Sequence, residues 1–305
     1  MTPMASSQRR VSIVIPTYNQ AGYLGEAIES ALAQTRRADE IIVIDNDSTD
    51  HTSQVAAGYP AVRYIRQPNR GVCGSTNRGI HEATGDYLVI LHSDDRLFPN
   101  HLETSLAAFE RHPEAAFVCG DYRWFGIGDS WHRHRCEPAP DYYATLLRLN
   151  FIGPPLVIMF RRDVLLKTGG FDAKYFGADD QELYLRIARY YPIHCHHEVV
   201  AEYRRHEGQN SKRTAMMLKA SMAVMQAQRP YLARNPAYQE AYREGIRHRQ
   251  KLYGESLFWQ GVAAFKAGQT REALACVSVL LRHDPQGLLG PMCRHLFGFP
   301  HPRTV

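Results

Sequence analysis

The sequence predicts an α/β fold, in which a largely parallel central sheet is flanked by helices and followed by an α-helical C-terminal region. Three observations predict it. Strand-like apolar segments alternate with helical patterns over about the first 95 residues. Polar clusters follow three of these strands, as expected where ligands bind at the carboxyl edge of a parallel sheet. Beyond Thr214, only helical patterns remain.

The first part of the chain contains four predicted strands separated by helices. Each strand is a short apolar run, and each helix repeats apolar residues at intervals of three or four. The predicted strands are 11–18, 40–50 with its polar turn, 62–67 and 86–95, and the helices are 22–35, 51–59 and the one that follows a glycine-bearing turn within 69–85. The polar clusters at the strand ends are 17–19, 45–50 and 93–95.

The middle section of the chain is less regular, and its elements are predicted from shorter patterns. We expect helices at 100–113 and 178–191, strands at 116–125, 130–137 and 192–206, and a short strand, a helix and a Gly169–Gly170 turn within 151–172. In the tail, residues 257–285 resemble one tetratricopeptide unit, although a single repeat fits a plain helical hairpin better. We therefore predict a catalytic domain at 1–213 and a basic helical extension at 214–305.

The composition places limits on the class of protein. The chain has 305 residues, 44% of them hydrophobic, which is enough to bury a large core. No apolar run approaches the roughly 18 residues that span a bilayer, and the run after Arg10 is too short for a secretory signal. We expect a cytoplasmic protein, in solution or peripherally bound at the inner face of the plasma membrane. The six cysteines show no paired spacing, which favours free thiols.

The charge is unevenly distributed along the chain. Residues 211–305 carry 14 Lys and Arg against 5 Asp and Glu, a net charge of +9, whereas residues 1–210 carry 22 against 26, a net charge of −4. A basic tail indicates an anionic partner. An anionic membrane is one candidate, with Tyr231, Tyr242 and Tyr253 as exposed aromatic contacts. The alternative is a helical cap with a solvated basic face, and we expect no nucleic-acid partner.

Two adjacent aspartates, Asp94 and Asp95, end the apolar run of the fourth predicted strand. Like charges at a buried strand end are unfavourable because the carboxylates repel each other and lose hydration. A strand end in solvent would remove the conflict. A divalent cation would also remove it, since hard cations prefer carboxylate oxygen. The pair alone leaves both interpretations open.

Six segments of the chain together resemble the family 2 glycosyltransferases of the GT-A fold. They are VSIVIPTYN, EIIVIDNDSTD, NRGVCGSTNRGIHEATGDYLVILHSDDRL, GGFD, ADDQELYLRIA and EYRRHEGQNS. They occur in the order of the family and at about its spacing, over roughly residues 11–211. The resemblance implies metal-dependent, inverting transfer of a sugar from a nucleotide-sugar donor to a hydroxyl of a glycan or lipid-linked acceptor, in bacterial surface-glycan assembly.

The resemblance also implies roles for the acids. Asp94 and Asp95 would bind the divalent cation, Mn²⁺ or Mg²⁺, and His206 would complete its ligand shell. Asp180 would be the general base, with Asp179 raising its pKa. Capping of a helix by both acids is the alternative for this second pair. The chain departs from the Asp-x-Asp pattern of the family because His92 stands at the first position.

The donor site implied by the resemblance comes from four segments. The expected nucleotide-sugar contacts are Pro16, Thr17, Tyr18, Asp45, Asn46, Asn69, Gly71, Asn77 and Arg204. Many relatives have an acid at the position of Asn46. An amide both donates and accepts hydrogen bonds, so the nucleobase stays open between uracil, guanine and thymine.

Other functions share parts of this pattern. A nucleotidyltransferase that makes the sugar donor would need a glycine-rich, basic loop after the first strand, and this chain has none. A nicotinamide dehydrogenase would need a G-x-G-x-x-G turn after the first strand, where this chain has PTYNQAGY. A catalytically degenerate GT-A fold that binds a nucleotide or a partner is the stronger alternative, because of His92. Asp94, Asp95, Asp180 and His206 argue against it.

Overall fold

The computed structural model describes residues 9–127, 133–134, 141–206, 208–209 and 213–286. The chain divides into two compact units. The first contains residues 1–146 and 150–207, and the second contains residues 208–305 together with 147–149. Along the chain, the second unit begins at residue 208, six residues before the predicted start of the helical extension at residue 214. The functions assigned to the two parts stay predictions.

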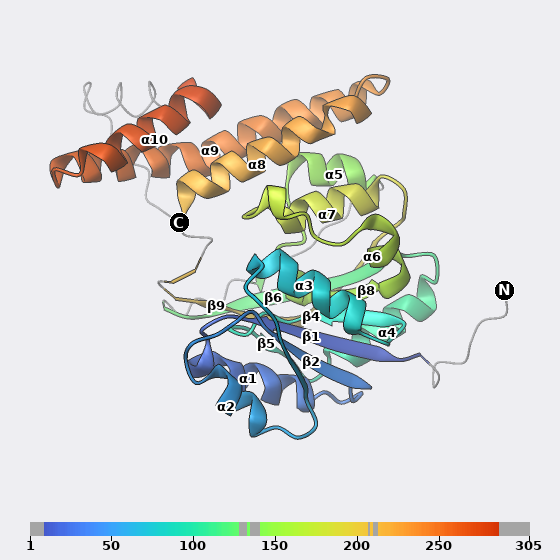
Figure 1. Ribbon diagram of the computed structural model, residues 1–305. Helices are drawn as coiled ribbons and strands as arrows, with labels where there is room; N and C mark the ends of the chain where they lie inside the picture. Colours follow the sequence, from blue (N-terminus) through green and yellow to red (C-terminus); the bar gives the residue numbers. More distant parts are fainter. Residues whose placement is uncertain (1–8, 128–132, 135–140, 207, 210–212, 287–305) are drawn as a thin grey trace. The chain divides into compact units, whose positions relative to one another are not determined.

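The strands of the first unit belong to one sheet, whose order is β3-β2-β1-β4-β8-β6-β9-β5, with β7 paired on β6 (Figure 1). Their bounds are β1 Val11–Thr17, β2 Glu40–Asp45, β3 Arg63–Arg66, β4 Tyr87–Ile90, β5 Arg96–Leu97, β6 Phe117–Gly126, β7 Arg133–His134, β8 Ile158–Arg161 and β9 His194–Arg205. The α/β fold class is confirmed. The part of the sheet built first along the chain, β3-β2-β1-β4, is parallel. Beyond it, β8 and β5 pair antiparallel with their neighbours, and β6 and β9 are parallel.

Helices cover both faces of this sheet. α1 and α2 lie on one face, and α3, α6 and α7 on the other (Figure 1). The helices of the first unit are α1 Ala21–Leu32, α2 Thr52–Ala57, α3 Gly71–Glu82, α4 His101–Arg111, α5 Tyr142–Arg148, α6 Arg162–Thr168 and α7 Asp179–Ala188, with 3₁₀ turns η2 Pro155–Val157 and η3 Ala173–Tyr175. The helix α5 was not predicted, and its last two residues group with the second unit.

Helix α3 packs closely on β1, which explains a glycine in the helix interior. A Cβ on Gly79 would lie 2.1 Å from Cγ1 of Val14, a fully buried residue of β1. The lost helix propensity of glycine, about 1 kcal/mol, is thus the cost of bringing the helix against the strand. This packing fixes the start of α3 next to the carboxyl ends of β1 and β2.

The register of the sheet brings polar strand ends from distant segments together. Thr17 pairs with Asp45 across β1 and β2. Arg96 of β5 pairs with Glu202 of β9, so the residues before β5 lie beside the end of β9. The long parallel pairing of β6 with β9, which has register shifts near Asp121, continues to the same end.

The second unit is helical. It contains α8 Thr214–Gln228, the 3₁₀ turn η5 Arg229–Tyr231, α9 Pro236–Lys266 and α10 Thr270–His283. Leu218, Leu257, Cys276, Val279 and Leu280 form its core. A plain helical hairpin is present where the repeat was considered, but its first helix begins at Pro236, well before residue 257.

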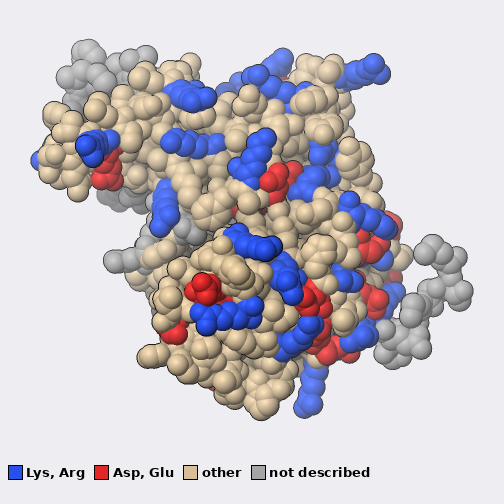
Figure 2. Space-filling model, in the orientation of Figure 1, with Lys and Arg blue, Asp and Glu red and all other residues tan. Residues whose placement is uncertain are grey.

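The surface of the second unit corrects one expectation. Tyr253 packs against the core of the unit and Tyr242 is half-buried, so neither is an exposed aromatic, whereas Tyr231 is 47% exposed. Basic side chains outnumber acidic ones over the helices of this unit on the face drawn in Figure 2. No helix in the described ranges is long and apolar enough to cross a bilayer.

The cysteine prediction holds for three residues and is wrong for a fourth. Cys73, Cys119 and Cys276 are buried and form no disulfide, whereas Cys195 is disulfide-bonded. Spacing along the chain could not show this, because β-sheet pairing decides which distant segments approach each other.

Candidate active site

The carboxyl ends of β1 and β2 are joined by a folded polar turn. Asn46 donates its backbone N–H to the carbonyl oxygen of Thr17 at 2.9 Å. The carboxylate of Asp45, which is 1% exposed, accepts from the Ser48 N–H at 2.9 Å and from the Tyr64 hydroxyl. Burial and this hydrogen bond to Asp45 raise the pKa of Tyr64, which therefore stays a donor. Asp45 therefore orders this turn. Its contact with the nucleotide-sugar donor stays a prediction.

Around this turn, the first predicted donor contacts differ in exposure. Pro16 and Thr17 are buried, and Tyr18 is 48% exposed. The Thr17 hydroxyl oxygen is buried and has no hydrogen-bond partner among the described residues. Such a group costs free energy unless a ligand or water satisfies it. The site therefore offers a polar atom that a bound molecule can use.

Asn46 is an internal connector. Its Oδ1 accepts from the Gln67 amide at 3.1 Å and from the Arg70 N–H at 2.9 Å, and its Nδ2 donates to Asn69 Oδ1 at 2.8 Å. Asn69 Oδ1 also accepts from the Gly71 N–H at 3.0 Å. The amide of Asn46 therefore orders the turn before α3.

Gly71 begins α3 in a backbone conformation that side chains disfavour, with φ of +70°. No atom lies within 4 Å of the Cβ that another residue would add there, so conformation alone requires the glycine. Helix α3 thus starts with exposed backbone beside the ordered Asn69 turn, an arrangement that suits an anion.

Asn77 does not point its amide toward this turn. Its Nδ2 donates to the Phe171 carbonyl at 2.7 Å, and its Oδ1 accepts from the Phe171 N–H at 2.8 Å. Both ends of the amide are therefore used to hold the GGFD segment against α3. Contact with the donor phosphates, which the resemblance implied for Asn77, would need this clasp to open.

The two acids that are predicted to bind a metal ion, Asp94 and Asp95, lie directly beside the end of β9. Asp94 Oδ2 and His206 Nε2 are 2.9 Å apart. Asp95 is 1% exposed, its Oδ1 accepts from the Arg204 N–H at 2.8 Å, and its Oδ2 has no partner among the described residues. Burial, and then the charge of Asp94, raise the pKa of Asp95 well above its usual value. A buried carboxyl with a free oxygen beside a second acid is a setting that a cation would stabilise.

Arg204 supports this acid pair. Its Nε donates to the Asp94 carbonyl oxygen at 2.7 Å, and its Nη2 lies 2.7 Å from Glu26 Oε2. The guanidinium also lies over the ring of Tyr23, at 4.9 Å, and over that of Phe125, at 4.3 Å. Glu26 was missed in the sequence because an acid on a predicted amphipathic helix is ordinarily solvated.

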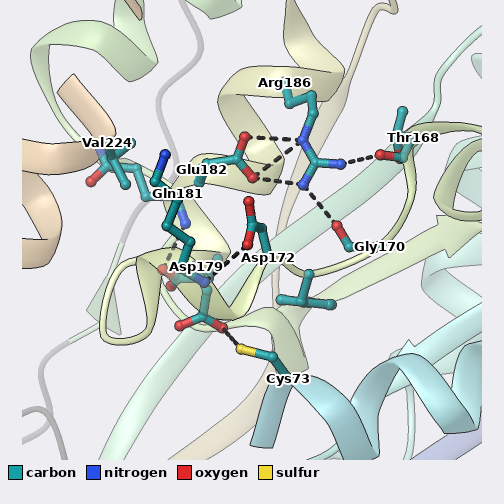
Figure 3. A network of polar contacts seen from close by, with 12 residues as sticks. Cys73, Thr168, Gly170, Asp172, Asp179, Gln181, Glu182, Arg186 and Val224 are labelled. Atoms are coloured by element: carbon teal, nitrogen blue, oxygen red, sulfur yellow. Dashed lines mark hydrogen bonds and ion pairs between the residues drawn. The ribbon is translucent and has the colours of Figure 1, made fainter. Parts of the chain in front are cut away.

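The second acid pair lies at the start of α7, and Figure 3 shows Asp179 there beside Cys73 of α3. Asp179 Oδ1 accepts from the Gly177 N–H at 3.0 Å, and its Oδ2 lies 3.4 Å from Cys73 Sγ. Asp180 Oδ1 accepts from the Gln181 N–H at 2.6 Å. Burial, and then the charge of Asp179, raise the pKa of Asp180 to about 7. The residue before α7, Ala178, makes no side-chain cap. The Gln181 N–H on Asp180 fits the capping alternative, whereas a carboxyl whose pKa is about 7 suits proton transfer.

Tyr122 of β6 connects the two acid pairs and was not predicted. Burial raises its pKa, and the charges of both Asp180 and Asp95 raise it further. A Cβ on Gly153 would lie 2.7 Å from the Tyr122 ring, so a glycine is needed where the ring packs. One acid of each pair, Asp180 and Asp95, therefore acts electrostatically on the buried Tyr122 hydroxyl.

The acids and histidine do not form a complete metal site by themselves. In the part of the chain that the structure describes, no group of three or more His, Cys, Asp and Glu side chains could hold a metal ion. Mg²⁺ commonly takes only one or two carboxylates from a protein and completes its shell with water and substrate phosphates. Asp94 and Asp95, with the free oxygen of Asp95, fit a site of that kind.

The sequence matches one family over more than half of its length. Residues 12–169 match the model of the glycosyl transferase family 2. An uncharacterized glycosyltransferase of Rickettsia felis is 31% identical over 215 residues, which cover 67% of this chain and 35% of that protein. Uncharacterized glycosyltransferase RP339 of Rickettsia prowazekii is 31% identical over 212 residues, which cover 66% and 65%. The matches thus span between about a third and two thirds of these relatives.

Two solved structures are similar in fold. TarS 1–349 of S. aureus in complex with UDP-GlcNAc has a TM-score of 0.68 at 16% identity, covering 91% of this chain and 82% of the other. Mannosyltransferase PcManGT of Pyrobaculum calidifontis, in complex with GDP-Man and Mn²⁺, has a TM-score of 0.60 at 21% identity, covering 96% and 88%. At these identities the similarity concerns the fold, which is of the GT-A type.

Replacing Asn46 with Asp tests the connector role. Asn46→Asp removes the donor to Asn69 Oδ1 and sets two acceptors against each other in a buried place. We expect the free energy of unfolding to fall by about 1–3 kcal/mol, measured by urea unfolding. Asp47→Asn is the matched control, because Asp47 and Arg66 are both about half exposed (54%) and such pairs contribute about 0–1 kcal/mol. Equal stability of the two variants would contradict the role.

Proposed function

Because the chain belongs to the glycosyl transferase family 2, we propose that it transfers a sugar from a nucleoside-diphosphate sugar to a hydroxyl group of a glycan or lipid-linked acceptor, with inversion at the anomeric carbon. The observation that carries this proposal is the presence of two buried acid pairs with different properties. Asp95 has a buried carboxyl oxygen without a hydrogen-bond partner among the described residues, and burial together with the charge of Asp179 raises the pKa of Asp180 to about 7.

The first cluster would hold the leaving group. Asp94, Asp95 and His206 would bind a divalent cation together with the donor diphosphate. The cation, when bound, supplies positive charge that stabilises the leaving diphosphate. Arg204 holds the Asp94 backbone and the Asp95 carboxyl in place, so its role in the proposal is to position the acids. The side chain of His92 has no role in this proposed cation site.

The second cluster would activate the acceptor. Asp180, once deprotonated, would remove the proton from the acceptor hydroxyl as its oxygen attacks the anomeric carbon. The bond from that carbon to the diphosphate breaks in the same displacement, so the configuration inverts and no covalent intermediate forms. Asp179 supports this role because its charge helps to keep the pKa of Asp180 near 7.

The residues of the proposed donor site do not specify one nucleobase. Thr17 offers a buried hydroxyl without a hydrogen-bond partner among the described residues, and the first turn of α3, which has no side-chain cap, offers backbone N–H groups to phosphate. The two structural neighbours were solved with UDP-GlcNAc and with GDP-Man. Both uridine and guanosine donors therefore belong in any test, as does thymidine because Asn46 differs from the acid common among relatives.

Thermal unfolding with nucleotides tests the donor site. We expect UDP, GDP or dTDP, or one of their sugars, to raise the unfolding temperature in the presence of Mn²⁺, since a ligand at a hundred times its Kd adds about 2.7 kcal/mol. Asp94→Ala should abolish the shift that depends on Mn²⁺. Asp163→Ala is the matched control, because Asp163 is exposed and pairs only with Lys167 on the surface of α6. Stabilisation by no nucleotide at all would leave the degenerate fold as the better description.

Substitution of the base tests the chemistry. We expect Asp180→Asn to lower kcat by about 10²–10⁴-fold while donor binding, followed by the same thermal shift, is retained. In the unchanged enzyme, kcat should fall as the pH decreases through about 7, since the raised pKa means that Asp180 gains its proton there. An activity that is flat from pH 5 to 8, or that survives Asp180→Asn, would exclude this residue as the base.

Contact of the second unit with an anionic membrane stays a prediction. One face of α10 carries exposed apolar side chains, with Leu274 63%, Val277 39% and Leu281 61% exposed. We expect the protein to sediment with phosphatidylglycerol vesicles, and the double substitution of Leu274 and Leu281 by Gln to reduce this several-fold. Leu166→Gln, at an exposed leucine of α6, is the control. Failure of the unchanged protein to sediment would exclude the membrane as partner.

A further inference from the structure

One face of α3 holds the segment that carries the proposed base. Cys73 and Asn77 are four residues apart, so they lie one above the other on the same face of the helix. Asn77 binds both backbone groups of Phe171, and Cys73 contacts Asp179. A Cβ on Gly170 would lie 2.3 Å from Asn77 Oδ1, so the segment approaches α3 as closely as a glycine allows.

In the contact between Cys73 and Asp179, the thiol is the hydrogen-bond donor. Burial, and then the charge of Asp179, raise the pKa of the Cys73 thiol, so the sulfur keeps its proton and donates it. Asp179 then has a donor on each oxygen, the Gly177 N–H on Oδ1 and the Cys73 S–H on Oδ2 (Figure 3). Hydrogen bonds of this kind favour the ionised form of a carboxyl.

The hydrogen bonds of Asp180 do not offset its burial. Its carboxylate accepts from the Gln181 N–H at 2.6 Å, and its own backbone N–H also lowers its pKa, but burial and the charge of Asp179 leave that pKa raised to about 7. The other titratable groups that face it are acidic or neutral: Asp179 on α7, Tyr184 one turn further along the same helix, and Tyr122 on β6. Two neighbouring carboxyls that share one proton leave it on the partner whose ionised form is less stabilised.

We propose that Cys73 is a positioning residue whose thiol keeps the negative charge of this pair on Asp179, so that the shared proton resides on Asp180. The inference rests on the proposed function, in which Asp180 is the base. It adds Cys73 of α3 to the residues that determine whether Asp180 is protonated. The thiol neither reacts nor touches substrate; its effect is on where one proton resides.

The consequence of removing the thiol can be worked out. Without Cys73, Asp179 keeps only the Gly177 N–H, so its ionised form is less stable and it competes for the proton. Asp180 is then ionised in more molecules at acid pH, and the acid limb of the rate profile moves to lower pH. Asp179→Asn removes the neighbouring charge altogether and should move the limb further in the same direction.

Four variants measured as kcat against pH test this. We expect Cys73→Ala to lower the midpoint by about 0.3–1 pH unit, the range expected for one modest hydrogen bond, and Asp179→Asn to lower it by at least one unit. Cys73→Ser restores a donor and should keep the midpoint of the unchanged enzyme. Adding Cys73→Ala to Asp179→Asn should change nothing more, because the interaction is already absent. Cys276→Ala, a buried thiol of the second unit, is the control.

A second readout separates this inference from the proposed function. The carboxyl ¹³C resonance of Asp180, assigned by its loss in Asp180→Asn, reports its titration without any substrate. An unmoved midpoint in Cys73→Ala by both readouts, or a midpoint in Cys73→Ser as low as in Asp179→Asn, would overturn the inference. If the resonance moves as expected but Asp180→Asn retains turnover, the role of Cys73 stands and Asp180 is not the base. If Cys73→Ala does not fold, Cys73→Ser and Asp179→Asn decide the matter.

Discussion

The placement of two adjacent carboxyl groups, the partly buried Asp94 and the buried Asp95, is the constraint on which the site depends. They follow β4 where it leaves the sheet, and Asp95 is almost completely removed from water. Repulsion between them and lost hydration would destabilise the fold if nothing offset them. The protein offsets part of the cost with the Arg204 N–H on Asp95 and with His206 on Asp94. One oxygen is left without a protein partner, and the proposed cation with its donor diphosphate accounts for it.

The groups that offset this charge lie near the C-terminal end of the sequence of the first unit. Arg204 and His206 reach the acids because β9 pairs with β5 on one side and with β6 on the other. Arg204 is itself held by Glu26 of α1 and by two aromatic rings. The acids, the arginine and the glutamate therefore form one electrostatic unit assembled from three separate segments, and a change in any of them alters the others.

Helix α3 links the two halves of the proposed reaction. Its first residue, Gly71, follows the turn that Asn46 and Asn69 order, and its next turns hold Phe171 and Asp179. Tight packing of Gly79 on Val14 fixes the helix against the sheet. Asn46 and Asn77 were expected to contact the nucleotide-sugar donor. Their amides instead make internal hydrogen bonds that shape the site.

The sequence alone determined the α/β class, the strands whose ends carry polar residues, and the acids at 94, 95, 179 and 180. It could do so because apolar periodicity and strand order act locally, and parallel strands place their carboxyl ends at one edge. Only the tertiary structure decided which polar groups face one another. Tyr122, Glu26 and Cys73 carry no local pattern, since their importance arises from β-sheet pairing and helix packing between segments far apart in the chain. The same physical reason explains the polar roles of Asn46, Asn77 and Arg204: an amide or guanidinium binds whichever partners the fold brings within about 3 Å.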